Sequence, residues 1–434
     1  MGKYIRMKKF IKKIMMPLVF SLLMVIYTLG SSITLGDTEA FKSYAREYNY
    51  HYLSFAISRY ISWSSRFLIE AITAYFSVHY IQFFVLIFLL SFLLMVSFVR
   101  LIGFDENKYL KYKLIVPTLA IFFFPINRLF DSAGVIATMT NYYVPMCLMA
   151  YSLLVFKKET RPYGYVFKLL GFIFVVQQEQ FALLSFIVFF TAIVYQLTQK
   201  ISVKKYIPFL FLSVMGILSV KLSPGNTKRT ITEIKEHFPE FANISLLRKL
   251  DVGFIRMTYD LLFNGEVTLF LILMLVSILI YAILKKKINQ SIGLVTILTM
   301  IILPYLHIWT PVSKMKVIYD SFPKGVHGDI LSITGNTAMS VYPDIVMILM
   351  LVVILAIIWT VLTSYQDRVI VFTLLISGTA TKMMLGLSPT VSISGIRTFV
   401  PMIFCGFIIT IYFAKLALDE IIENNKEAKI KSNS

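Results

Sequence analysis

The sequence predicts an all-α integral membrane protein, and three observations lead to that fold class. Of the 434 residues, 58% are hydrophobic and only 15% are charged, with a mean hydropathy of +0.76, whereas a soluble domain carries about 25% charged residues. The apolar residues form repeated blocks of roughly 17 to 25 residues, the length of helix that crosses about 30 Å of hydrocarbon. These blocks do not alternate in polarity, which argues against a membrane β-barrel.

Twelve apolar blocks are interpreted as transmembrane helices. In chain order they cover residues 14–35, 79–101, 114–130, 141–157, 163–177, 181–199, 206–222, 267–285, 291–309, 344–364, 369–386 and 397–418. The first block follows Lys12 and Lys13 and is not followed by a small-residue cleavage site, so we expect an uncleaved first helix. Residues 1–423 are predicted to form one polytopic transmembrane domain, and residues 424–434 a polar cytoplasmic tail that we expect to be disordered.

The basic residues orient these helices in the membrane. With twelve spans, 25 basic and 8 acidic residues fall on one side and 17 basic and 15 acidic residues on the other, giving net charges of +17 and +2. The positive-inside rule therefore places both termini in the cytoplasm. The total charge of +19 lies mainly in short loops beside span ends, as membrane insertion requires, so it does not indicate a nucleic-acid partner.

Three long segments are predicted on the outer side, at residues 36–78, 223–266 and 310–343. Because an enzyme or receptor needs surface for its chemistry, the outer face is the expected working face. Apolar residues recur at helical spacing over Leu246–Phe263 with basic residues between them, which predicts an amphipathic helix lying on the outer surface. The apolar stretch Phe67–Val78 is expected to lie in the interface or to re-enter the membrane.

Asp37 and Glu39 are the candidate catalytic residues. They follow the first predicted span directly, where a carboxylate can accept a proton from a sugar hydroxyl at the membrane surface. The alternative is an ordinary helix stop followed by a solvated acidic loop.

Two further outer motifs combine cations with turn-forming or aromatic residues. Trp63 and Arg66 lie just before apolar sequence, and this pair suits sugar stacking and bidentate phosphate binding, or simply anchoring at the interface. Asn226, Lys228 and Arg229 follow the Ser-Pro-Gly turn that ends the seventh span. Cations on the outer side are unexpected under the positive-inside rule, so they indicate a binding site for a lipid phosphate. The alternative is that these residues form a turn that merely ends a helix.

Polar residues also occur at the ends of other predicted spans. Asn141 and Tyr142 open the fourth span, Glu179 lies where the fifth span meets the sixth, and Arg397 is the charged residue of the last outer loop. Polar groups at membrane depth are candidates for function, and a charged group near hydrocarbon is expected to have a partner. A tight outer hairpin is the alternative explanation for Glu179.

The sequence contains no sign of a cofactor or a metal. It has no phosphate-binding glycine loop, and its five histidines lack metal-ligand spacing. Cys147 and Cys405 both lie within apolar blocks, so neither a disulfide framework nor a cysteine metal site is expected.

Taken in this order, the motifs resemble the GT-C class of membrane glycosyltransferases, in particular the bacterial families that glucosylate O-antigens or add side-chain sugars to Gram-positive cell-wall polysaccharides. The resemblance is carried by the acidic loop (Asp37, Glu39), the Trp-x-x-Arg element (63–66), the Asn-Tyr element (Asn141, Tyr142), Glu179 and Ser-Pro-Gly-Asn-x-x-Arg (223–229). It covers roughly the first 230 residues plus Arg397. The chain departs from the pattern at Ser65, where glycine is expected, and in separating the acidic pair by one residue.

The resemblance implies an inverting enzyme of the plasma membrane that takes a hexosyl or N-acetylhexosaminyl group from a polyprenyl-phosphate donor. The acceptor that it implies is a cell-surface polysaccharide or lipid-linked glycan on the outer face. It implies no cofactor and no nucleic-acid partner; membrane lipids surround the protein. The implied roles are general base for Asp37, with Glu39 as its rival, donor phosphate binding for Arg66, Lys228, Arg229 and Arg397, and substrate contact for Trp63, Asn141, Tyr142, Glu179 and Asn226.

Two other functions fit the same pattern. A polysaccharide polymerase or ligase of the same membrane class would use lipid-diphosphate substrates and depend more on outer-loop arginines than on one aspartate. A lipid or solute transporter would place charged residues near the middle of its spans, whereas here they collect at span ends, including Lys221 and Lys382.

Overall fold

The computed structural model describes residues 2–31, 36–104, 107–109, 112, 114–124, 129, 133–157, 162–322 and 340–433. Every regular element within these residues is a helix, so the predicted all-α class is confirmed. The chain forms two compact units: unit 1 is Met1–Thr232 with Gly395–Phe404, and unit 2 is Glu233–Ser394 with Cys405–Ser434.

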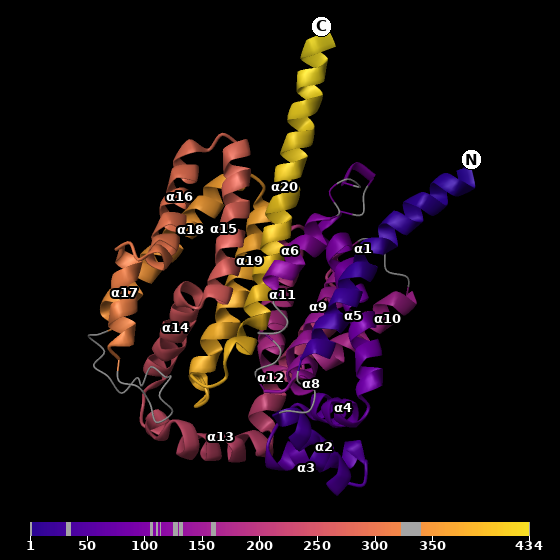
Figure 1. The fold of residues 1–434 in the computed structure, drawn as a ribbon, viewed down its shortest axis with the longest axis vertical. Coiled ribbons are helices and arrows are strands. Elements are labelled where there is room, and N and C mark those ends of the chain that lie inside the picture. The colour runs from indigo at the N-terminus through magenta and orange to yellow at the C-terminus, as the bar shows by residue number, and fades with distance from the viewer. Residues whose placement is uncertain are drawn as a thin grey trace. The chain divides into compact units, whose positions relative to one another are not determined.

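Unit 1 is a group of long apolar helices with a cluster of short ones. Its main helices are α1 (Gly2–Gly30), α2 (Asp37–Glu47), α3 (Tyr52–Ser62), α4 (Phe67–Val78), α5 (Tyr80–Ile102), α6 (Ile115–Phe123), α8 (Val135–Thr138), α9 (Val144–Ser152), α10 (Pro162–Val175), α11 (Glu179–Thr198) and α12 (Ile207–Leu222). Helix α5 packs between α1 and α9, and α11 packs along α12. The short helices α2, α3 and α4 lie beside one another (Figure 1) around the buried residues Phe41, Ala45, Phe55 and Ala74.

Three further elements, wholly or partly in unit 1, position polar residues. A π-helical turn, η2 (Met139–Tyr143), joins α8 to α9, and a 3-10 turn, η8 (Ile396–Phe399), leads into α20 (Val400–Asn433). Helix α13 (Pro224–His237) begins in unit 1 after a break at Ser223, where the chain bends by 55° from α12. Proline is favourable at the first position of a helix because its missing N–H has no helical partner there.

Unit 2 is organised around α14 (Leu246–Phe263). Its other helices are α15 (Gly265–Leu284), α16 (Ile288–Ile302), α17 (Pro311–Asp320), α18 (Val341–Val361), α19 (Tyr365–Met383) with the 3-10 turn η7 (Met384–Leu387), and most of α20. Helix α14 packs against α15, α19 and η7. Helix α14 comes very close to the end of α19, because a β-carbon on Gly253 would meet the backbone carbonyl oxygen of Met383.

The amphipathic helix predicted over Leu246–Phe263 has the predicted bounds. Its buried face includes Val252, Ile255 and Leu261. Other helices of unit 2 cover this face. The C-terminal tail differs from its expectation of disorder, since α20 continues to Asn433. That segment contains neither glycine nor proline, the two residues that most disfavour a helix interior.

Within the described residues, eight helices are long and apolar enough to cross a membrane, or nine if the bent α12–α13 pair is one span. They coincide with predicted spans, and the multi-pass membrane class follows. Three more predicted spans correspond wholly or partly to the shorter apolar helices Ile14–Gly30 and Pro162–Val175 and to α6. The predicted span 114–130 extends beyond α6, and part of it lies outside the described residues. The count of twelve stays a prediction.

Candidate functional site

The centre of the candidate site is an ion pair between Arg66 and Glu179. Nε of Arg66 donates to both carboxylate oxygens of Glu179 at 3.1 and 2.9 Å, and Nη2 lies 2.8 Å from Oε2. Arg66 directly precedes α4, and Glu179 is the first residue of α11, after Gln178 caps that helix by accepting from the N–H of Phe181 at 2.8 Å. The two side chains are only 19% and 15% exposed, so water does little to weaken the pair.

Asn141 completes a three-residue group around the guanidinium of Arg66. Nη1 of Arg66 donates to Oδ1 of Asn141 at 2.8 Å, and Nδ2 of Asn141 donates to the carbonyl oxygen of Ala137 at 2.8 Å. The second bond fixes the orientation of the amide, so its oxygen faces Arg66. Asn141 lies in the π-helical turn η2, a helix type that occurs frequently at functional sites.

Electrostatics keep Arg66 positively charged. Burial opposes its charge, but the carboxylate of Glu179, followed by Tyr142 and Glu70, outweighs burial and raises the pKa of Arg66 above its ordinary value. Tyr142 is buried beside Asn141 in the same turn. Arg66 and Glu179 together carry no net charge, so the pair is a rigid polar centre rather than a net positive site.

Trp63 lies against two further arginines. The guanidinium carbon of Arg59 is 5.3 Å from the centre of the Trp63 ring, and that of Arg229 is 5.7 Å from it. Both distances are within the range of cation–π attraction, which favours a guanidinium over an indole. Arg59 is also paired, since its Nε donates to Glu70 Oε2 at 3.0 Å. Arg229 is half-buried and follows the turn that starts α13.

The Ser-Pro-Gly-Asn turn docks directly onto the Trp63 segment. Ser223 Oγ donates to the carbonyl oxygen of Tyr60 at 3.0 Å, and Oδ1 of Asn226 accepts from the N–H of Ser65 at 3.4 Å. A β-carbon on Gly225 would lie 2.4 Å from the backbone nitrogen of Trp63. Only glycine allows this approach, so the turn explains how residues 161 positions apart meet.

The segment that carries Arg397 also reaches the start of α11. Nε2 of Gln180, the residue after Glu179, donates to the carbonyl oxygen of Thr398 at 3.0 Å. Arg397 is half-buried in this 3-10 turn. The predicted outer turn therefore lies beside the helix end that presents Glu179.

The two acidic candidates, Asp37 and Glu39, lie outside the group around Arg66. Asp37 and Glu39 belong to the first turn of α2, and both are exposed. Glu39 pairs with Lys42 at 3.7 Å. The N–H of Asp37 donates to the carbonyl oxygen of Ala133 at 2.9 Å, which anchors the start of the helix. Within the described residues, no hydrogen bond joins the side chain of Asp37 to the group around Arg66.

The structure thus places six of the eleven predicted site residues in three sets of contacts on the segment 63–66 of unit 1. These are Trp63 with Arg229, Arg66 with Asn141 and Glu179, and Asn226 with the segment between Trp63 and Arg66.

The other five predicted site residues are placed around or away from these six. Tyr142 is buried beside Asn141 in the turn η2, and Arg397 lies in the turn that contacts Gln180. Lys228 is exposed on α13. In the part of the chain that the structure describes, neither Asp37 nor Glu39 makes a hydrogen bond or an ion pair with the six.

Sequence reasoning missed the second ion pair, Arg59 with Glu70. Glu70 is 9% exposed in its side chain and stands in an apolar stretch. A carboxylate in apolar sequence predicts a cationic partner, and Arg59 lies four residues before Trp63, one helical turn away. That combination is the signal from which the pair could have been predicted.

No family model, no curated protein and no solved structure matches this chain. The functional assignment therefore depends on the residues of the chain itself.

Proposed function

We propose that the protein is an inverting glycosyltransferase with a GT-C-like fold, which transfers a sugar from a polyprenyl-phosphate donor to a cell-surface polysaccharide or lipid-linked glycan on the outer face of the plasma membrane. The observation that supports this most is a pair of contact groups on the segment 63–66: Trp63 with Arg229, and Arg66 with Asn141 and Glu179. These residues come from four segments of the chain, and the motif order that resembles such enzymes contains all five.

The helix ends around this group favour an anion. Arg66 precedes α4, Glu179 starts α11, and Asn226 belongs to the first turn of α13. Each helix N-terminus carries a partial positive charge of about +0.5. Three such ends in contact through their side chains make a favourable environment for a phosphate.

Charge balance assigns different roles to the arginines. Because Glu179 neutralises Arg66, we assign Arg66 to positioning Asn141 and the α11 end rather than to carrying the phosphate alone. Arg229, held against Trp63, supplies the cation that faces the donor phosphate. Arg397 is the second proposed cation, because its turn is tied to Gln180.

The chemical step needs a base and a stabilised leaving group. The acceptor hydroxyl oxygen attacks the anomeric carbon of the sugar, and its proton passes to the carboxylate of Asp37. The bond between the anomeric carbon and the phosphate oxygen breaks, and the electron pair stays on the lipid phosphate. Positive charge at Arg229 and Arg397 stabilises that developing charge. Asp37 is preferred to Glu39 because Glu39 is paired with Lys42.

A transfer assay in detergent tests this proposal. Purified protein is mixed with a polyprenyl phosphate that carries a radiolabelled hexose and with lipid-linked glycan acceptors. We expect label to move to the acceptor without any ion gradient, which a pure transporter cannot do. Absence of transfer with hexose and N-acetylhexosamine donors alike, from protein that stays monodisperse, would refute the proposal.

Transport is the second candidate, favoured by a buried ion pair in unit 2. Lys382 of α19 is 2% exposed, and its Nζ lies 3.7 Å from Oδ2 of Asp260, which also accepts from Nε of Arg256 at 3.1 Å. A buried lysine in an apolar helix is costly unless it is paired, and such groups occur in transport paths. Lys382 lies near the end of its apolar helix, Tyr365–Leu387, rather than near the middle, so glycosyl transfer is preferred.

A further inference from the structure

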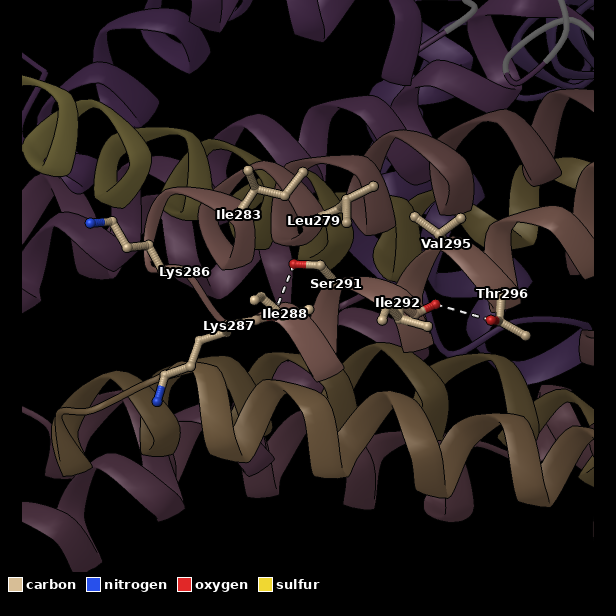
Figure 2. Close-up of a pocket in the computed structure, with 9 residues that line it drawn as sticks. All are labelled: Leu279, Ile283, Lys286, Lys287, Ile288, Ser291, Ile292, Val295 and Thr296. Atoms are coloured by element: carbon tan, nitrogen blue, oxygen red, sulfur yellow. Dashed lines mark hydrogen bonds between the residues drawn. The ribbon is translucent and has the colours of Figure 1, made fainter.

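A groove runs between α15 and α16 in unit 2, along the exposed side of this helix pair. Its volume is about 340 Å³. Five apolar side chains line its length: Leu279, Ile283, Ile288, Ile292 and Val295. Figure 2 shows these side chains in two rows from the two helices, with Ser291 between them.

The groove belongs to membrane-spanning helices and is open. Both α15 and α16 are among the helices apolar and long enough to cross a membrane. Ile283, Ile288 and Ile292 are 57%, 70% and 61% exposed. Exposed isoleucines on such helices face hydrocarbon, so a lipid acyl chain is the natural occupant of the groove.

Two cations stand at one end of the groove. Lys286 and Lys287 form the turn between the helices, and Figure 2 shows both side chains at the same end of the apolar rows. The preceding residue, Lys285, pairs with Glu420 at 2.5 Å. Within the described part of the chain, no carboxylate pairs with Lys286 or Lys287. These two charges are therefore available to an anion.

The backbone of this turn favours glycine but carries lysine. The N–H of Lys287 bonds to the carbonyl oxygen of Ala282 and that of Lys286 to Ile283, the pattern of a Schellman helix end. Lys286 has a φ of 55°, a left-handed conformation that glycine adopts without strain and other residues do not. The chain thus has lysine where glycine would be easier to accommodate, as it also does at Lys200, which has a φ of 57°.

We propose that this groove binds an anionic diacyl phospholipid, with one acyl chain along the α15–α16 rows and the phosphate at Lys286 and Lys287. The positive-inside orientation puts the turn at the cytoplasmic leaflet, which is rich in anionic lipids. The donor lipid of the proposed reaction acts at the opposite face. Lipid binding here is independent of sugar transfer, so either proposal can fail without the other.

Native mass spectrometry of the full-length protein with added phosphatidylglycerol or phosphatidylcholine tests the head-group site. Juxtamembrane lysines each contribute about fivefold to the binding of anionic lipid, so the double variant Lys286→Gln/Lys287→Gln should bind phosphatidylglycerol about 25-fold more weakly. The matched control is Lys200→Gln/Lys204→Gln, which removes two exposed lysines from another turn predicted to be cytoplasmic. An equal loss in the control, or no preference of the unaltered protein for phosphatidylglycerol, overturns the proposal.

The acyl-chain part is tested by filling the groove. Ser291→Phe should weaken phosphatidylglycerol and phosphatidylcholine alike, because it blocks the chain rather than the head group. Ile280→Phe, an exposed position on α15 that does not line the groove, is the control. Unchanged binding by Ser291→Phe, or displacement of phosphatidylglycerol by polyprenyl phosphate, contradicts the assignment. If the double lysine variant is not monodisperse, Lys286→Gly, which relieves the left-handed turn, should still lose about fivefold.

Discussion

Among single residues, the Arg66–Glu179 pair decides what the candidate site can do. Three contacts of 2.8 to 3.1 Å and low exposure make it a fixed element, and Asn141 extends it to a third segment. Its two charges cancel, so the proposed mechanism assigns the phosphate to Arg229 and Arg397 rather than to Arg66. Mutagenesis can test which arginines position other residues and which bind the phosphate.

Glu179→Gln should destabilise the protein. Arg66 would keep its charge but lose its carboxylate, and a hydrogen bond to a charged group contributes about 1.5–3 kcal/mol. We therefore expect a fall of several degrees in the unfolding temperature in detergent. Glu39→Gln is the control, because its exposed pair with Lys42 should contribute less than about 1 kcal/mol. Equal unfolding temperatures for both variants would show that the Arg66 pair does not stabilise unit 1.

Arg229→Gln should lower sugar transfer by about 10²-fold, the usual effect of removing one group that stabilises transition-state charge. Arg229→Lys should recover only part of the activity, because an ammonium lacks the planar group that lies against Trp63. The rate at saturating donor measures the effect. Lys235→Gln, an exposed residue of the same helix, should transfer normally. A similar loss in Lys235→Gln would reduce the role of Arg229 to general surface charge.

Asp37→Asn should lower the transfer rate by about 10²- to 10⁴-fold, the typical contribution of a general base. The change keeps the shape of the side chain and leaves the backbone bond to Ala133 intact, so insertion and donor binding should persist. Transfer and donor binding are measured in parallel. Near-normal transfer by Asp37→Asn together with collapse in Glu39→Gln would move the base to Glu39.

Among the helices and turns, one tight contact brings the motif segments together. The first turn of α13 rests on the end of α3 at Gly225, where an added β-carbon would meet backbone rather than a movable side chain. This contact sets the position of Arg229 relative to Trp63. The ends of α4, α11 and α13, rather than their lengths, therefore build the candidate site.

Gly225→Ala should disturb that contact. A methyl group 2.4 Å from the nitrogen of Trp63 forces the backbones apart, and overpacking of this kind costs about 1–3 kcal/mol. We expect lower thermal stability and reduced transfer together. Gly265→Ala is the matched control, because nothing lies within 4 Å of its added carbon and the change favours the helix. A stability unaffected by Gly225→Ala would mean that the turn can move without cost.

At the scale of the whole molecule, the main prediction is that both termini lie in the cytoplasm. Single cysteines at Thr230 and at Asn289, both exposed, are introduced after Cys147 and Cys405, both buried, are replaced by alanine. A membrane-impermeant maleimide applied to intact cells should label position 230 and spare position 289, because the charge split places the first outside. The opposite pattern would place the candidate site in the cytoplasm and rule out a donor on the outer leaflet.

Sequence patterns were sufficient to predict the class of the protein and the positions of most of its long helices. Long apolar blocks predict spans because crossing hydrocarbon is a local requirement of length and composition. For the same reason the amphipathic pattern predicted α14 with its observed bounds, since helical spacing is a property of one segment. The C-terminal tail was the exception. Its polarity predicted disorder, but polar residues can also form a helix, and α20 continues to Asn433.

How the motifs combine became visible only from the packing of the helices. The sequence treated Arg66 as a phosphate ligand and Glu179 as a separate polar group, whereas the structure pairs them across 113 positions of the chain. It also left the function of Gly225 unspecified beyond a turn, whereas the glycine is required by the closeness of α3. Such contacts depend on which helix ends pack together, and local patterns carry no information about partners that far apart in sequence.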